Sequence, residues 1–171
     1  MSSLGFREIQ RFRQPWIWCL VLLSAGVMFW IFGYGLIQQL ILGRPWGNQP
    51  MSDTGLIVAS ILTFAFSLGM VWLFLVMALV VEVRGDALYI HFKPLKRRTV
   101  SYGDISRVEA VEYRPVVHYG GWGIRRGRNG WAYNVSGNRG VRLDFHDGKH
   151  LLIGSPRSTE LAAAIEKARG H

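Results

Sequence analysis

The fold is decided by residues 54–81, TGLIVASILTFAFSLGMVWLFLVMALVV, which include no charged side chain. A helix rises about 1.5 Å per residue, so about 20 residues cross a hydrocarbon core of about 30 Å. We therefore predict that residues 54–81 form a transmembrane helix. Glu82 ends the run, and the more polar, strand-like sequence that follows predicts a water-facing domain over residues 82–171.

A second charge-free run, residues 16–42, lies upstream and predicts another transmembrane helix. It is much longer than the apolar core of a signal peptide, about 7–15 residues, and no small-residue cleavage site follows it. Residues 43–53 are rich in Gly and Pro and predict a short outside loop. The tryptophans expected at the head-group level, as interface aromatics, are Trp16, Trp18 and Trp46.

The two predicted spans contain no Asp, Glu, Lys, Arg or His. Ionisable groups inside a membrane usually mark a proton relay or an ion path, so an oligomeric pore or transporter subunit is the least favoured function. Lys and Arg are frequent before the first span and after the second, whereas the connecting loop has one arginine. The positive-inside rule then places both termini on the cytoplasmic side of the cell membrane.

Residues 1–15 are predicted to be a cytoplasmic segment with two interpretations. Apolar side chains from Phe6 to Phe12 fall near helical spacing among charged ones, which favours a short interfacial helix. The alternative is a helical extension of the first span without a lipid role of its own.

The net charge of +9 over 171 residues indicates anionic partners, such as lipid head groups or acidic proteins. The plainer interpretation is a membrane protein that keeps its basic residues on the cytoplasmic side. We expect no nucleic-acid partner, and a protein partner or a second copy of the chain remains open. Cys19 is the single cysteine, which excludes a disulfide within the chain and a cysteine-based zinc site, and no cofactor or metal is predicted.

Residues 82–171 predict six to seven short strands followed by one amphipathic helix that opens at Ser155-Pro156. The last hairpin allows a register to be predicted. A three-residue loop at 146–148 pairs Leu143 with Leu151 and Val141 with Ile153, so apolar residues meet across the strands. The fold class is therefore a membrane helical hairpin plus an α+β domain.

Several short motifs share their order with a known group of proteins. They are FREIQRFRQPW at 6–16, Gly-Asp-Ile at 103–105, a glycine-rich stretch at 120–131, VRLDFHDGK at 141–149 and SPRSTEL at 155–161. In this order the chain resembles small uncharacterised prokaryotic two-span membrane proteins with a C-terminal bacterial pleckstrin-homology-like (PH-like) domain. The resemblance implies a bent antiparallel sheet capped by one C-terminal helix. It implies no function, because one fold hosts many functions.

Two basic groups are the candidate sites for an anion or a partner: Lys96, Arg97 and Arg98 in a predicted turn, and Arg125, Arg126 and Arg128 in the loop at 120–130. The loop could hold a phosphate with backbone N–H groups and arginines, although a twisted hairpin with solvated arginines is the plainer interpretation. If one strand over 83–92 stood away from the bilayer, its far end would lie about 33 Å off. The basic turn would then face the cytosol, whereas a strand lying flat would let it contact lipid.

No catalytic motif is found, and His146 and His150 at a hairpin tip do not suffice for a metal site. We therefore expect a non-catalytic, membrane-anchored interaction or scaffold module that binds a protein or an anionic lipid. The alternative is a sensor or enzyme that binds a phosphorylated ligand through the loop at 120–130.

Overall fold

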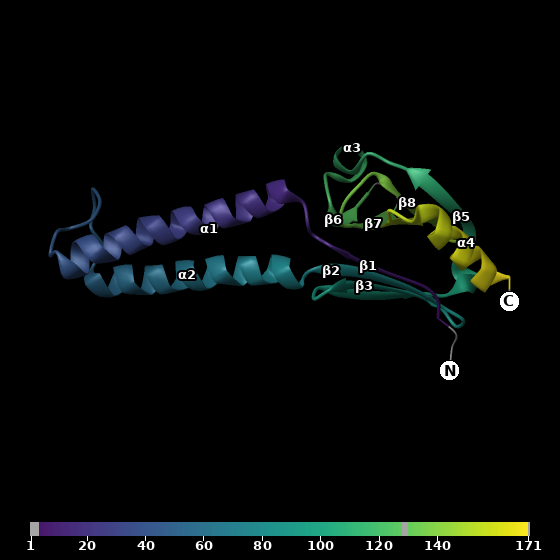
Figure 1. Ribbon diagram of the computed structural model, residues 1–171, viewed down its shortest axis with the longest axis horizontal. Helices are drawn as coiled ribbons and strands as arrows, with labels where there is room; N and C mark the ends of the chain where they lie inside the picture. The colour runs from purple at the N-terminus through teal and green to yellow at the C-terminus, as the bar shows by residue number, and fades with distance from the viewer. Residues whose placement is uncertain (1–3, 128–129, 171) are drawn as a thin grey trace. The chain divides into compact units, whose positions relative to one another are not determined.

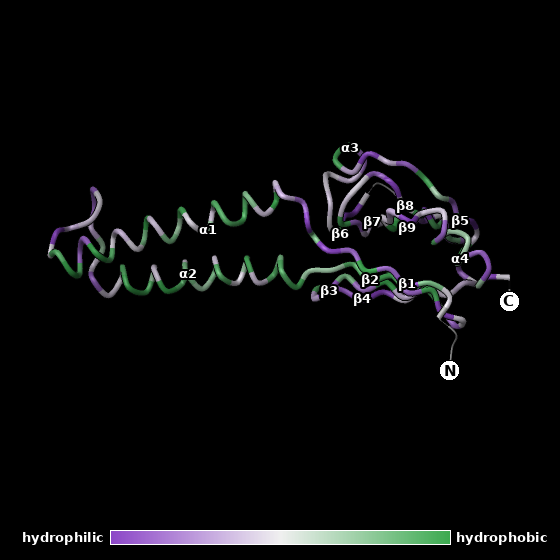
Figure 2. Tube along the Cα trace, viewed as in Figure 1, coloured by the Kyte–Doolittle hydropathy of each residue, from purple (hydrophilic) through white to green (hydrophobic). Residues whose placement is uncertain are grey.

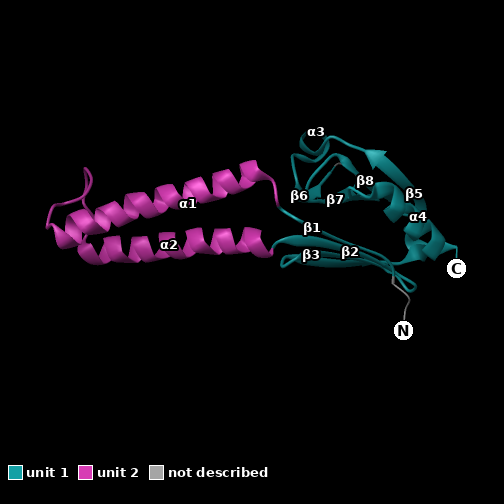
Figure 3. Cartoon of the chain, viewed as in Figure 1, with its two compact units in different colours: residues 1–12, 77–171 teal, residues 13–76 magenta. Residues whose placement is uncertain are grey.

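The computed structural model describes residues 4–127 and 130–170 (Figure 1). The chain forms two compact units (Figure 3). Unit 2 comprises residues 13–76, and unit 1 combines the segment up to Phe12 with everything from Met77 onward. The N-terminal segment therefore belongs to the same unit as the C-terminal half of the chain.

Unit 2 is a pair of long apolar helices, as the hydropathy colouring of Figure 2 shows. Helix α1, Pro15–Leu36, continues into the π-helical turn η1, Ile37–Ile41, and helix α2 is Asp53–Val76. Both are long and apolar enough to cross a membrane by length and composition. The rings of Phe29 and Phe64 stack with centroids 4.4 Å apart, so the helices pack on each other.

Unit 1 begins with a four-stranded antiparallel sheet in the order β1-β2-β3-β4. Strand β2 lies inside this sheet, paired with β1 and β3 along its two edges, and its residues from Ala78 to Val83 are buried on both faces. The strands are β1 Leu4–Arg11, β2 Ala78–Arg84, β3 Leu88–Lys93 and β4 Lys96–Val100.

A five-stranded sheet in the order β5-β8-β9-β7-β6 completes the unit. Strands β7 and β9 pair in parallel and the other pairs are antiparallel. The strands are β5 Ile105–Glu112, β6 Gly123–Arg126, β7 Gly130–Asn134, β8 Arg139–Phe145 and β9 His150–Gly154. Between them lie η2 Tyr102–Asp104 and α3 Pro115–Tyr119, and α4, Ser158–Arg169, follows.

The core of unit 1 lies between the two sheets, which face each other in Figure 1. Leu79, Ile90, Leu143 and Ile153 are completely buried. Helix α4 packs against strands of both sheets and buries one apolar stripe that includes Leu161. Burial of this apolar surface is the main force that holds the sheets together.

The N-terminal segment is not an interfacial helix, as its apolar spacing had suggested, but strand β1. Phe6, Glu8, Gln10 and Phe12 are buried at every second position, which is the period of a strand. The polar Glu8 and Gln10 obscured this pattern in the sequence.

The second apolar helix ends at Val76, five residues before the predicted end at Val81. The residues from Ala78 to Val81 begin strand β2 and are buried in unit 1. A strand buried on both faces is a continuous apolar run, which periodicity alone does not distinguish from the end of a helix. The domain therefore begins before Glu82 and also includes β1.

The predicted register of the last hairpin is confirmed. Val141 pairs with Ile153 and Leu143 with Leu151. Gly148 has a φ of +78°, as the three-residue loop requires. Within the described ranges the unit has nine strands, because β1 and the start of β2 lie outside residues 82–171. Seven strands, β3 to β9, lie wholly within those residues, for which six to seven were predicted, and α4 begins at Ser158, three residues after Ser155.

Candidate functional site

A row of paired residues crosses the first sheet at the end where the chain enters and leaves unit 1. Strand β2 turns back between Arg84 and Ala87, whose backbone groups are hydrogen-bonded at 3.1 Å. Strand β3 consequently returns to the start of β2, where Lys93 pairs with Ala78, and Arg11 pairs with Ala78 from the other side. Residues directly opposite each other share a face, so Arg11 and Lys93 lie on the same side of the sheet.

The neighbouring row adds a third basic residue on that outer face. Ile9, Val80, His91 and Arg97 are paired across the four strands, two residues along from the first row. Successive side chains of a strand point to opposite faces, so this row lies on the same face as Arg11 and Lys93. Burial, and then the nearby Arg97, lower the pKa of His91, so this imidazole is neutral at pH 7.

Arg11, Lys93 and Arg97 are exposed, and within the described ranges none of them forms an ion pair. The basic residues farther along the face differ in this respect. Arg7 and Arg84 both pair with Glu82, whose pKa is lowered chiefly by the hydrogen bond from Arg84. The uncompensated positive charge is therefore concentrated at one end of the sheet.

Both basic groups predicted from the sequence contribute to this end. Lys96 lies opposite the buried Phe92, so it points toward the space between the sheets, where its Nζ sits 4.6 Å from the ring centroid of Trp131. Trp131 pairs with Arg126 across the β6–β7 hairpin. We call Arg11, Lys93, Lys96, Arg97 and Arg126 the basic end.

Other predicted residues lie elsewhere or have other roles. Arg98 sits 5.7 Å from the ring centroid of Phe145 and lines an open pocket of about 450 Å³, in which Lys149 is paired with Asp147. Arg125 donates from Nε to the carbonyl oxygen of Trp122 at 3.0 Å. Arg128 lies outside the described residues.

Two glycines of the loop at 120–130, Gly127 and Gly130, lie where a side chain would clash with neighbouring atoms. A Cβ on Gly130 would lie 1.9 Å from the carbonyl oxygen of His150, because β7 and β9 approach closely at this point. A Cβ on Gly127 would lie 2.8 Å from the ring of Tyr119. These contacts favour the twisted hairpin over a phosphate-binding loop.

The three predicted interface aromatics all lie in unit 2. Trp16 is at the first turn of α1 and half exposed, and Trp18 follows it on the same helix. Trp46 lies in the connection between the helices and packs on α1, where a Cβ on Gly35 would be 2.8 Å from its ring.

Sequence reasoning missed Arg11 as a member of the site, and it grouped Lys93 with the basic turn without placing it beside Arg11. The signal for Arg11 was its spacing of four from Arg7, because an even spacing places both on one face of a strand. Lys93 could be assigned only from the return of β3. Within the described ranges no group of three or more His, Cys, Asp or Glu side chains is placed to hold a metal ion.

A comparison with models of protein families gives a match. A protein-family model described as "Family of unknown function (DUF6141)" matches residues 1–170. No curated protein and no solved structure matches the chain.

Proposed function

This chain belongs to DUF6141, a family of unknown function, and from its geometry we propose a non-catalytic, membrane-anchored binding module. Helices α1 and α2 anchor it in the cytoplasmic membrane, with both termini on the cytoplasmic side. The basic end of unit 1 binds the anionic head groups of membrane lipids.

One observation carries this proposal: the basic end is the end of the sheet that the chain joins to both apolar helices. Arg11 precedes the start of α1 at Pro15 by four residues, and Ala78, its partner, follows the end of α2 at Val76 by two. Helices that span a bilayer would keep these residues near the lipid phosphates. Each Lys or Arg close to an anionic surface contributes about 1 kcal/mol of attraction.

A PH-like identity for unit 1 is part of the proposal. Its support is the order of elements, two largely antiparallel sheets followed by a C-terminal helix that packs on both. The parallel pair of β7 and β9 departs from an all-antiparallel sheet.

The experiment compares lipid selectivity of the full chain reconstituted in bilayers. Spin-labelled phosphatidylglycerol and phosphatidylcholine report, by electron paramagnetic resonance, how strongly each lipid associates with the protein. We expect a preference for the anionic lipid that weakens in high salt, because ions screen exposed charges. The triple variant Arg11→Gln/Lys93→Gln/Arg97→Gln should lose this preference.

The matched control is Arg107→Gln/Arg139→Gln/Lys149→Gln, which removes the same charge from residues that already have acidic partners. It should keep the wild-type preference. Equal selectivity in the two triple variants would contradict the proposal. If the protein showed no lipid preference but bound inorganic phosphate, the alternative of a soluble phosphorylated ligand would be favoured instead.

A further inference from the structure

Four large apolar side chains of unit 1 are exposed within the described residues: Ile9, Leu95, Val116 and Val117. Leu95 is 60% exposed in the β3–β4 turn, and Val116 and Val117 are 62% and 73% exposed on the short helix α3. Single apolar side chains are common on protein surfaces, but apolar tips flanked by basic residues are also what a surface entering a membrane interface presents.

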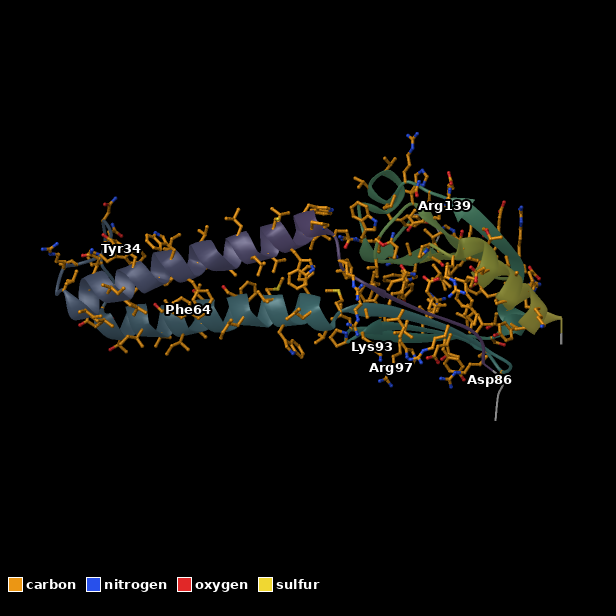
Figure 4. All side chains as sticks on the ribbon, viewed as in Figure 1. Tyr34, Phe64, Asp86, Lys93, Arg97 and Arg139 are labelled. Carbon is orange, nitrogen blue, oxygen red and sulfur yellow. The ribbon has the colours of Figure 1, made fainter. Side chains whose placement is uncertain are left out.

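In the sequence, Leu95 lies in the turn between Lys93 and Lys96, two residues of the basic end. Figure 4 shows Lys93 and Asp86 at opposite ends of the first sheet, as the β2–β3 turn requires. The tip at Leu95 therefore projects at the end where the chain continues into α1 and α2.

Helix α3 reaches the same end of unit 1 through a series of contacts. The side chain of Tyr119, its last residue, lies against Gly127 at the β6–β7 turn. The same hairpin contributes Trp131, on which Lys96 stacks. Figure 1 accordingly shows α3 and β6 together at one end of the unit.

We propose that Leu95, Val116 and Val117 insert into the interfacial layer of the bilayer, with the basic end beside them at the phosphates. This inference rests on the proposed function and adds an apolar contact to it. The apolar side chains form two separate tips with basic neighbours, Lys93 and Lys96 at one and Arg114 at the other. A fluid lipid surface accepts separate tips, and anionic head groups complement their basic flanks.

The test places an environment-sensitive fluorophore, NBD, on single cysteines in the full chain, with Cys19→Ser as the background. Leu95→Cys and Val117→Cys report the two tips, and Asp86→Cys is the matched exposed control at the opposite end of the sheet. The labelled proteins are reconstituted in vesicles of phosphatidylcholine and phosphatidylglycerol. Some vesicles also contain lipid with a spin label high on the acyl chain.

We expect blue-shifted emission and spin-label quenching at positions 95 and 117, and neither effect at position 86. Quenching at position 95 alone would overturn the insertion of α3 and leave the proposed function intact. Quenching at neither position would overturn the insertion, while the lipid preference measured by electron paramagnetic resonance would decide the proposed function separately. Quenching at position 117 alone, or equal quenching at position 86, would contradict a shared membrane-facing end. Quenching at positions 95 and 117 in a protein that retains Arg11, Lys93 and Arg97 but shows no preference for phosphatidylglycerol would reject the proposed function and keep the apolar contact.

Discussion

Glu8 is a buried carboxylate that ties the first strand to the C-terminal part of unit 1. It is 7% exposed, and its Oε2 accepts a hydrogen bond from Ser155 Oγ at 2.7 Å. Gln10 donates to Glu8 and also to the carbonyl oxygen of Gly154 at 2.7 Å. Burial raises the pKa of Glu8, and the hydrogen bonds from Ser155 and Gln10 partly oppose that change.

The raised pKa of Glu8 makes the stability of unit 1 depend on pH. Below pH 4.5, the ordinary value, both folded and unfolded states hold the proton. As pH rises through the raised pKa, the unfolded state releases its proton first, so the wild type loses stability. Each unit of raised pKa corresponds to about 1.4 kcal/mol.

Glu8→Gln keeps a hydrogen-bond acceptor for Ser155 but no longer titrates. We expect the wild type to become less stable relative to this variant between pH 4.5 and neutral pH. Thermal unfolding of both full chains in detergent, over a pH series, measures the difference, in which the other titrating groups cancel. A difference that stays constant across the series would refute the role given to Glu8.

At the scale of elements, strands β1 and β2 are joined across a long separation in the sequence. Ile9 pairs with Val80, although the whole of unit 2 lies between them along the chain. The pair of helices is thus an insertion between two neighbouring strands of one sheet. Phe6 of strand β1 and Phe12, the residue after the strand, lie in the buried interior, so the pairing brings the N-terminal segment into the core of unit 1.

Cross-linking tests this register. In the Cys19→Ser background, Ile9→Cys/Val80→Cys places two cysteines directly opposite each other, within reach of a disulfide. Ile9→Cys/Val81→Cys is the control, since adjacent strand residues point to opposite faces. We expect mild oxidation to cross-link the first pair and not the second, seen as a mobility change on non-reducing gels. Failure of the first pair, or equal reaction of both, would exclude the β1–β2 register.

For the whole molecule, the pairing of β1 with β2 constrains how the chain can cross a membrane. Paired strands must lie on one side, so the segment between them crosses an even number of times. Two helices, α1 and α2, satisfy this condition. From the distribution of Lys and Arg we propose that the shared side is the cytoplasmic one.

Labelling with a membrane-impermeant maleimide in spheroplasts tests this topology. With Cys19→Ser as the background, Asn48→Cys in the loop between the helices should react in intact spheroplasts. Asp147→Cys in unit 1 should react only after the membrane is permeabilised. Reaction of Asp147→Cys alone in intact spheroplasts would reverse the proposed orientation, and reaction of both positions or of neither would argue against two spans.

The sequence by itself determined the two long apolar helices, the final hairpin and the positively charged composition. These properties are local: a charge-free run suffices for a long apolar helix, and matching Leu143 with Leu151 sets a hairpin register. The sequence also located Lys96, Arg97 and Arg126 as candidates. It misplaced the end of the second helix, because the buried strand at Ala78–Val81 is as apolar as a membrane segment.

Only the tertiary structure decided that β1 belongs to the first sheet and that the basic end adjoins the links to both helices. If residues 83–92 formed one long strand standing away from the bilayer, the basic turn would lie at its far end. The reversal between Arg84 and Ala87 brings Lys93 back beside Ala78. The physical reason is that the position of a charge along a sheet depends on where strands turn and which distant strand they pair with. Charge and hydropathy along the chain do not contain that information.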